Sequence, residues 1–194
     1  AAKAALENAG VKPEELDLII ASTVSGDYAS PSLSCLVQKR IGATCMAFDI
    51  SAACSAFIFM LDVAAGFFAK QKLRNVLVVG AERMSRIVDW SDRSTCVIFG
   101  DGAGAAVLSP GDGYEASTFH VEGGDSVLRV PQEPGISPFF SGDGAKPYIH
   151  MNGQETFRFA VNSMTADITK VLDDAGLTMD DIALVIPHQA NYRI

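Results

Sequence analysis

The feature of this sequence that most constrains its fold is an internal repeat. When the chain is shifted by 166 positions, Leu6–Ile20 aligns without a gap on Leu172–Ile186. Each copy has the pattern of a helix end, a stopping glycine, an acidic turn and an apolar strand. A period this long excludes a solenoid of short repeats. The repeat predicts a duplicated α/β unit, although two unrelated copies of this common arrangement would look the same.

The segments between the two copies alternate between helical and strand patterns, which predicts an α/β fold. The helical pattern at 54–70 is apolar on nearly all faces, as is typical of a buried helix. Residues 110–150 are rich in Gly, Pro, Ser and Asp, and we expect loops and strand pairs there. The other predicted helices are 32–41 and 154–175, and the predicted strands are 17–23, 46–50, 75–80, 95–98, 103–108 and 181–187.

Composition narrows the possible partners and the compartment. The net charge of −8 argues against a nucleic-acid partner, because phosphate binding needs a basic surface. We find no signal peptide and no apolar run of membrane length, so no membrane partner is expected. The four cysteines form no C-x-x-C pair and no zinc-like cluster, so we expect no metal and a reduced, cytoplasmic protein.

Cys54, in the segment D-I-S-A-A-C-S-A-F, is the first candidate for chemistry. It lies between the predicted strand 46–50 and the predicted helix 54–70. At a helix start, unpaired N–H groups and the helix dipole stabilise a thiolate, which predicts a thiol pKa lowered by about a unit or more. A backbone N–H of the same turn could also donate to an oxyanion. A cysteine among small residues is, however, more often part of a core.

His188, in V-I-P-H-Q-A-N, strengthens the case for Cys54. It follows an apolar predicted strand, and ligands of α/β sheets gather at such strand ends. The repeat aligns His188 with Ser22, so this histidine is particular to one half. A lone histidine after a strand is usually structural, but one placed near a strand-end cysteine is a candidate partner for it. His120 and His150 lie in the loop-rich region and have no comparable context.

The glycine-rich segment Gly100–Gly104 is not a phosphate-binding loop. It lacks the G-x-x-x-x-G-K-[ST] pattern, and apolar residues follow it rather than a clear helix. We interpret it as close backbone packing at a strand or a bulge. The remaining cysteines, Cys35, Cys45 and Cys96, are interpreted as small core residues.

Three motifs in this order, D-I-S-A-A-C-S-A-F, then D-R-S-T with I-F-G-D-G-A-G-A-A-V-L, then P-H-Q-A-N-Y-R-I, closely resemble β-ketoacyl-acyl carrier protein synthase III. The resemblance covers essentially the whole chain, and P-H-Q-A-N-x-R is the most specific motif. It implies the thiolase-like fold, two similar α/β halves layered α/β/α/β/α. Here the fold is expected to be incomplete at both ends. The expected domains are 1–110, carrying the nucleophile, and 111–194, the start of the second half.

The resemblance implies a Cys-His-Asn triad, of which Cys54 and His188 match the first two members. The family's Asn would lie beyond Ile194, and Asn191 belongs to the H-Q-A-N motif itself. The chain is therefore expected to be part of a longer enzyme and, by itself, to be incomplete for activity. The implied reaction is a decarboxylative condensation of an acyl-CoA with malonyl-acyl carrier protein, which initiates fatty acid synthesis. The CoA thioester is a substrate, so no cofactor is expected.

The resemblance also implies binding residues. Arg93 matches the family's arginine beside the CoA nucleotide. A guanidinium suits this position because it can both stack and pair with phosphate. Some members carry a bulky Phe at the position of Ser30. The smaller serine would leave a longer acyl pocket here. Residues expected to line the substrate tunnel are Ile98, Met151, Gly153, Phe157, Ala190, Asn191 and Ile194. Residues expected to dock the acidic carrier protein are Arg158, Gln189 and Arg193. A homodimer is expected as well.

Two alternatives stay open. A related acyltransferase or ketosynthase of secondary metabolism would share Cys54 and His188 but use another acceptor. A non-catalytic partner subunit would have an unreactive cysteine, and the presence of both residues argues against it.

Overall fold

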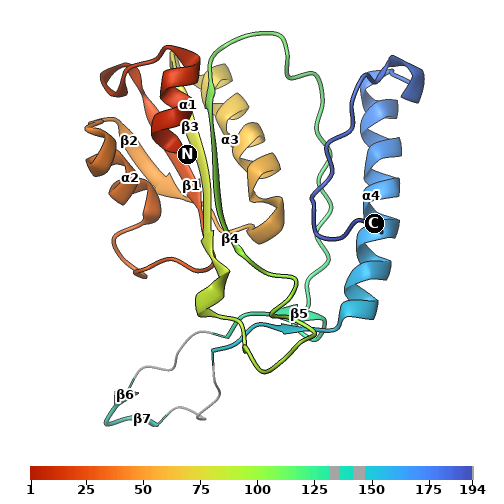
Figure 1. Ribbon diagram of the computed structural model, residues 1–194. Coiled ribbons are helices and arrows are strands. Elements are labelled where there is room, and N and C mark those ends of the chain that lie inside the picture. Colours follow the sequence, from red (N-terminus) through yellow and green to blue (C-terminus); the bar gives the residue numbers. More distant parts are fainter. Residues whose placement is uncertain (132–135, 142–146, 194) are drawn as a thin grey trace. The chain divides into compact units, whose positions relative to one another are not determined.

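The computed structural model describes residues 1–131, 136–141 and 147–193 (Figure 1). The chain forms two compact units. Unit 1 comprises Ala1–Arg83 and Asp101–Tyr114, and unit 2 comprises Met84–Gly100 and Glu115–Ile194. The turn-rich segment Met84–Gly100 thus groups with unit 2, whereas the expected boundary was a single cut at 110. That the two units are thiolase-like halves stays a prediction.

Unit 1 is built on a four-stranded sheet in the order β2-β1-β3-β4. Its strands are β1 (Leu18–Ser22), β2 (Met46–Asp49), β3 (Val76–Arg83) and β4 (Asp101–Leu108). Strand β1 runs parallel to β2 and β3, and Ala21 pairs with both Asp49 and Val79. Strand β4 is antiparallel to β3. The three parallel strands therefore end at one edge of the sheet, where α/β proteins place their ligands.

Helices cover both faces of this sheet (Figure 1). Side chains alternate along β1, so Ile19 and Ala21 enter the core beneath α1 (Ala2–Ala9) and α2 (Leu33–Ile41). Leu18 and Ile20 enter the opposite core beneath α3 (Ala56–Lys70). All four side chains are fully buried, and a buried Leu or Ile contributes about 1.5–3 kcal/mol to stability. The continuous apolar run of β1 therefore marks the centre of a three-layer α/β/α unit.

The expectation that the 54–70 helix is buried all round is wrong for unit 1. Helix α3 buries one stripe of small and flexible residues, Ala56, Met60 and Ala64, against the sheet. Phe57 and Ile58, on its other side, are about half exposed. The expectation of no membrane-length apolar run is corrected too, because Ala53–Lys70 is long and apolar enough by composition. One stripe of this helix packs against the sheet of unit 1, and a single apolar helix is weak evidence for a membrane span.

The internal repeat extends to individual hydrogen bonds. The helix of each copy ends at a glycine in the left-handed conformation, Gly10 with φ 65° and Gly176 with φ 67°. In the first copy, the amides of Gly10 and Val11 donate to the carbonyls of Glu7 and Leu6. In the second copy, 166 residues later, those of Gly176 and Leu177 donate to Asp173 and Leu172. Glycine adopts this φ without steric cost, so both helix stops follow directly from the sequence.

The acidic turn after each glycine is also repeated. Each copy contains a short 3₁₀ helix, Pro13–Glu15 in the first and Met179–Asp181 in the second. In both, the carboxylate at the third position accepts the backbone N–H of the residue before the turn, at 2.8 Å. Asp181 also accepts the Thr178 hydroxyl, and these two bonds lower the pKa of its carboxyl group. The two copies thus share one local structure.

The copies diverge at the strand that should follow. In the first copy that strand is β1, whereas residues 182–187 form no strand although 181–187 predicted one. Leu184 and Ile186 are 73% and 81% exposed. A strand exists only when neighbouring backbone pairs with it, and in the described part of the chain no strand pairs with this segment. The prediction of a strand at 181–187 is therefore wrong.

Unit 2 contains the long helix α4 (Gly153–Ala175), capped by the Asn152 side chain. Two-residue strands pair as β5 (Leu128–Arg129) with β8 (His150–Met151), and β6 (Ile136–Ser137) with β7 (Phe140–Ser141). The predicted strand 95–98 is wrong, because this segment forms helical turns in which the amides of Cys96 and Phe99 donate to Asp92 and Thr95. A small core of Met84, Val88 and Ile149 packs against Cys96, Phe99 and Val130, and so joins the helical turns to the residues next to β5 and β8.

Candidate active site

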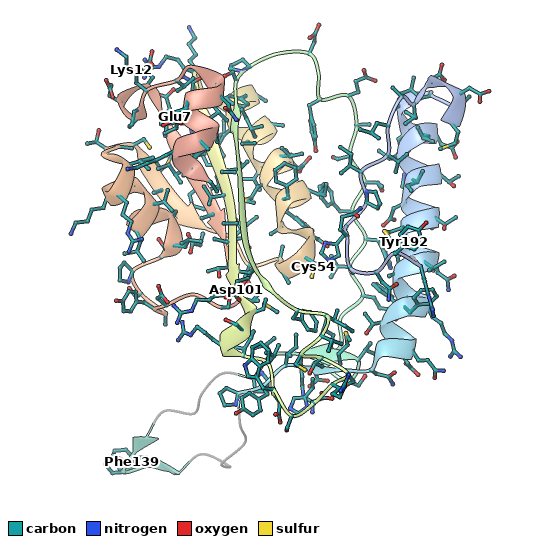
Figure 2. All side chains as sticks on the ribbon, viewed as in Figure 1. Glu7, Lys12, Cys54, Asp101, Phe139 and Tyr192 are labelled. Carbon is teal, nitrogen blue, oxygen red and sulfur yellow. The ribbon has the colours of Figure 1, made fainter. Side chains whose placement is uncertain are left out.

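Cys54 lies in a strained turn at the edge where the parallel strands end. The turn is a 3₁₀ helix, Ala53–Ser55, between β2 and α3, and the Ser55 amide donates to the Ala52 carbonyl at 3.0 Å. Ala53 has φ +44°, a conformation that costs a residue with a side chain about 1–3 kcal/mol. Cys54 itself is exposed, and Figure 2 shows it at the end of α3 nearest this edge. Strain of this kind concentrates at functional turns.

The expected lowering of the Cys54 pKa is wrong for this structure. Although part of Cys54 is exposed, packing around its sulfur removes water and raises the pKa of the thiol. A backbone hydrogen bond of Cys54 opposes this effect, and the negative charge of Glu82 adds to it. The residue also lies before the first α-helical residue, Ala56, and the helix dipole weakens beyond the first turn. The Cys54 thiol is therefore protonated at rest.

This raised pKa predicts the pH dependence of Cys54 alkylation. Because only the thiolate reacts, the iodoacetamide rate should reach half its maximum at a higher pH in the folded chain than in the urea-unfolded chain. The rate is followed at Cys54 by peptide mass spectrometry across a pH series. The variant Glu82→Gln should shift the folded midpoint to lower pH, because it removes a negative charge. If the alkylation midpoint lies at a lower pH in the folded chain than in the unfolded chain, the raised pKa of Cys54 is contradicted.

Two carboxylates at the same edge were missed by the sequence reasoning. Asp49, the last residue of β2, accepts the amides of Leu33 at 2.7 Å and Ser34 at 2.8 Å, and so caps α2. Glu82, near the end of β3, accepts the Val24 amide at 2.9 Å and the Ser25 hydroxyl. The signal available was an acidic residue at the end of a predicted apolar strand. The partners, 15 to 58 residues away, could not be identified from the sequence.

His188 lies in unit 2, in the exposed segment that follows the second copy of the repeat. The segment is ordered locally, since the Gln189 side chain donates to the Pro187 carbonyl and the Arg193 amide to the Asn191 side chain. The partnership of Cys54 and His188 stays a prediction, because the two residues belong to different units.

The other predicted binding residues fall on four segments. Ser30 is exposed in the connection between β1 and α2, in unit 1. Arg93 and Ile98 are exposed in the helical turns that follow β3 along the chain. Met151 ends β8, and Gly153, Phe157 and Arg158 form the first turns of α4. Gln189, Ala190, Asn191 and Arg193 are exposed near His188, and Ile194 lies outside the described residues.

The turn that carries Arg93 is fixed by the aspartate before it. The Asp92 carboxylate accepts the amide and hydroxyl of Ser94 and the hydroxyl of the buried Thr95. These bonds hold the pKa of Asp92 below its usual value, and the nearby His150 contributes. The exposed guanidinium of Arg93 is thus carried by an ordered backbone. The predicted role of Arg93 is to bind an anion.

The glycine-rich segment is confirmed as strand and corrected in detail. Asp101–Leu108 form β4, and Gly104 pairs with Gly80 across the sheet. A side chain added at Gly102 or Gly104 would meet open space, so close packing at these two glycines is not what the structure has. Within the described ranges, no group of three His, Cys, Asp or Glu residues is arranged to hold a metal ion.

Comparison with known proteins finds a family match over the part of the chain that carries Cys54. The family model described as 3-oxoacyl-[acyl-carrier-protein (ACP)] synthase III matches residues 48–124, which include Cys54 and β4. The β-ketoacyl-[acyl-carrier-protein] synthase III of Clostridium acetobutylicum is 46% identical over 199 positions. The alignment covers 100% of this chain and 61% of that relative. The chain thus spans about three fifths of the curated relatives it matches.

Solved structures agree at the level of fold. The 3-oxoacyl-[acyl-carrier-protein] synthase III of Aquifex aeolicus has a TM-score of 0.81 at 46% identity, over 100% of this chain and 60% of that one. A priming β-ketosynthase of a polyketide biosynthetic pathway has a TM-score of 0.88 at 37% identity, over 100% of this chain and 59% of that one. The expected thiolase-like α/β fold is therefore confirmed over the part that the chain covers. Along its whole length, the chain is therefore similar to 3-oxoacyl-[acyl-carrier-protein] synthase III enzymes, and the family model matches its residues 48–124.

Proposed function

We propose that this chain carries the nucleophile of a decarboxylating condensing enzyme, which joins an acyl-CoA primer to malonyl-acyl carrier protein and so initiates fatty acid synthesis. The observation that supports this most directly is the placement of Cys54. It lies in a strained turn at the edge of the sheet where the three parallel strands end, within the segment that matches the synthase III family. An exposed cysteine held in this way is suited to accept an acyl group.

In the first half-reaction, the Cys54 sulfur attacks the thioester carbonyl of acyl-CoA. A new carbon–sulfur bond forms, the bond to CoA breaks, and CoA leaves as its thiol with the proton that Cys54 gave up. Because the Cys54 thiol is protonated at rest, it needs a proton acceptor, and His188 is our candidate. Backbone N–H groups of the turn around Cys54 stabilise the oxyanion.

In the second half-reaction, malonyl-acyl carrier protein loses CO₂, and the resulting carbanion attacks the acyl group on Cys54. His188 donates a hydrogen bond to the thioester carbonyl as it gains enolate charge, which stabilises the transition state. The carbon–sulfur bond to Cys54 then breaks, leaving the 3-ketoacyl group on the carrier protein. Arg93 binds the CoA nucleotide, and the tunnel residues on β8, α4 and the His188 segment line the path of the pantetheine.

The carrier protein docks on basic residues of unit 2. Arg158 and Arg193 are exposed cations on a chain whose net charge is −8, so they offer a local exception to its acidic character. Attraction of this kind raises the association rate of an acidic partner and is weakened by salt. We also propose a homodimer and a cytoplasmic location, as the resemblance to synthase III implies.

A second candidate is priming of a polyketide rather than a fatty acid. The similarity to a polyketide priming ketosynthase, at 37% identity over the full chain, favours it specifically. Both functions use Cys54 in the same first step. They differ in which carrier protein accepts the product, so a comparison of the two classes of carrier protein decides between them.

The test is intact-mass analysis of the full-length protein incubated with straight-chain acyl-CoAs of increasing length. We expect a mass gain equal to one acyl group with at least one acyl-CoA, and the preferred length identifies the primer. Peptide mapping should place the acyl group on Cys54. A chain that gains no mass with any acyl-CoA, while remaining folded and alkylated at Cys54 by iodoacetamide, would contradict the first half-reaction.

A further inference from the structure

The turn that carries Arg93 is closed by its neighbour, Asp92. One carboxylate oxygen of Asp92 accepts the Ser94 amide at 2.9 Å and the Ser94 hydroxyl at 2.6 Å. The other carboxylate oxygen accepts the Thr95 hydroxyl at 2.9 Å, and the Asp92 carbonyl accepts the Thr95 amide at 3.2 Å. The backbone on both sides of Arg93 is thus fixed by one residue, while the Arg93 side chain stays exposed.

This closed turn is also anchored to the rest of unit 2. Thr95, at its end, is only 1% exposed. The next residue, Cys96, packs against the small core of unit 2 to which Ile149 belongs. The Ile149 amide, one residue before β8, donates to the Ile87 carbonyl at 2.7 Å. The turn with Arg93 is therefore joined to β8, the strand that leads into the predicted tunnel residues of α4.

The charge of Asp92 by itself opposes the role predicted for Arg93. A carboxylate next to the arginine repels the phosphates that the arginine is expected to bind, because like charges disfavour association. Within unit 2 this charge is stabilised by the hydrogen bonds from Ser94 and Thr95 and by the nearby His150 on β8, which together lower the pKa of Asp92. The bonds and the charge of Asp92 thus have opposite expected effects on anion binding, so substitutions can separate them.

We propose that Asp92 is a positioning residue that holds Arg93 in the orientation in which it binds the nucleotide end of CoA. The proposal rests on the proposed function, because it takes the CoA nucleotide as the anion that Arg93 binds. A guanidinium pairs with phosphate through a planar, directional set of N–H groups, so a change in its orientation lowers affinity. Asp92 acts through the backbone of the turn, by its bonds to Ser94 and Thr95.

The test is calorimetry of CoA binding to the full-length protein, in a double-mutant cycle of Asp92→Ala and Arg93→Ala. We expect Asp92→Ala to weaken CoA binding about tenfold, the typical effect of one lost hydrogen bond to a charged group, although it removes a negative charge. If Asp92 acts through Arg93, the double variant should bind CoA no more weakly than Arg93→Ala alone.

Asp92→Asn is the conservative variant that should recover most of the lost affinity. Its side-chain oxygen can accept the Ser94 amide, and its side-chain nitrogen can donate to the Thr95 hydroxyl. Hydrogen exchange should show the Ser94 amide released in Asp92→Ala and protected in Asp92→Asn. A role in general stability alone would not make the CoA affinity follow the state of this amide.

Asp181→Ala is the matched control. Asp181 also accepts an amide and a hydroxyl, both from Thr178, at 2.8 Å and 2.7 Å. These bonds lower the pKa of its carboxyl group as well, so it closes its turn in the same way. It belongs to the same unit, and no binding role is predicted for its turn. The control should release the Thr178 amide and leave the CoA affinity unchanged within about twofold.

Two results would overturn the positioning role of Asp92. One is an Asp92→Ala variant that binds CoA as tightly as the unsubstituted protein, or more tightly, because only the charge would then matter. The other is a double variant whose loss is the sum of the two single losses, because Asp92 would then act independently of Arg93. If Asp92→Ala fails to fold, Thr95→Val removes one bond of the same closure and should also weaken CoA binding.

The failure of this inference can be told apart from the failure of the proposed function. CoA affinities that follow the expected pattern in a protein that no acyl-CoA acylates would support the role of Asp92 and contradict the proposed function. A protein that is acylated at Cys54, but whose CoA affinity is the same in Asp92→Ala as without the substitution, would contradict the role of Asp92 alone.

Discussion

Replacing Cys54 by serine is expected to remove the S-acyl adduct, lowering its rate of formation at least about 1000-fold. The exchange is nearly isosteric, so the strained turn at Ala53 and the packing of α3 should be kept. A hydroxyl lacks the acidity and nucleophilicity of a thiol. Its surroundings in the variant stay the same, so the loss reports on the reactivity of the side chain itself. The measurement is intact mass after incubation with the preferred acyl-CoA.

The control for this prediction is Cys45→Ser. Cys45 is another free cysteine of unit 1 whose thiol pKa is raised by burial, and it packs against the core beneath α1 and α2. It lies at the start of β2, whereas Cys54 follows the end of that strand. The adduct should persist in this variant. An adduct that survives in Cys54→Ser and disappears in Cys45→Ser would show that Cys45, and not Cys54, is the nucleophile.

Replacing His188 by alanine is expected to lower CO₂ release from malonyl-acyl carrier protein about 100- to 1000-fold, the typical cost of one lost oxyanion donor. His188 lies in an exposed segment, so its removal should leave the fold intact. The S-acyl adduct on Cys54 should still form, more slowly, because the thiol loses its proton acceptor. The measurement is the release of labelled CO₂ from malonyl-acyl carrier protein by the full-length protein already acylated with the primer.

His150→Ala is the matched control for His188. His150 is an exposed histidine of the same unit, located on β8, and it has no predicted role in the reaction. Its loss should leave the rate of CO₂ release unchanged within about twofold, as for an ordinary surface substitution. Equal losses in both variants would indicate a general effect on unit 2 and would remove the case for His188.

Local elements were predictable wherever one short stretch of sequence contains all the interacting groups. Gly10 and Gly176 ended their helices as predicted, because a positive φ favours glycine in any context. The alternation along β1 placed Ile19 and Ile20 on opposite faces of a buried strand. The acidic turns formed too, because each carboxylate bonds a residue three positions away.

Elements that depend on distant partners were not predictable in this way. The apolar pattern around Leu184 predicted a strand, but a strand needs paired backbone, and the described residues supply none there. The pKa of Cys54 was expected to fall on the basis of a nearby helix start. It rises because surrounding atoms exclude water and because Glu82, 28 residues further along the chain, adds negative charge.

The sequence by itself determined the α/β class, the repeat, the helix stops and the identity of the candidate nucleophile. Periodicity and glycine conformation act over a few residues, and the motifs around Cys54 and His188 are contiguous. Only the tertiary structure decided which backbone groups the carboxylates of Asp49 and Glu82 bind. Asp49 and Glu82 reach their partners across the sheet, and hydrogen bonds between residues far apart in sequence exist only once β1, β2 and β3 are in register.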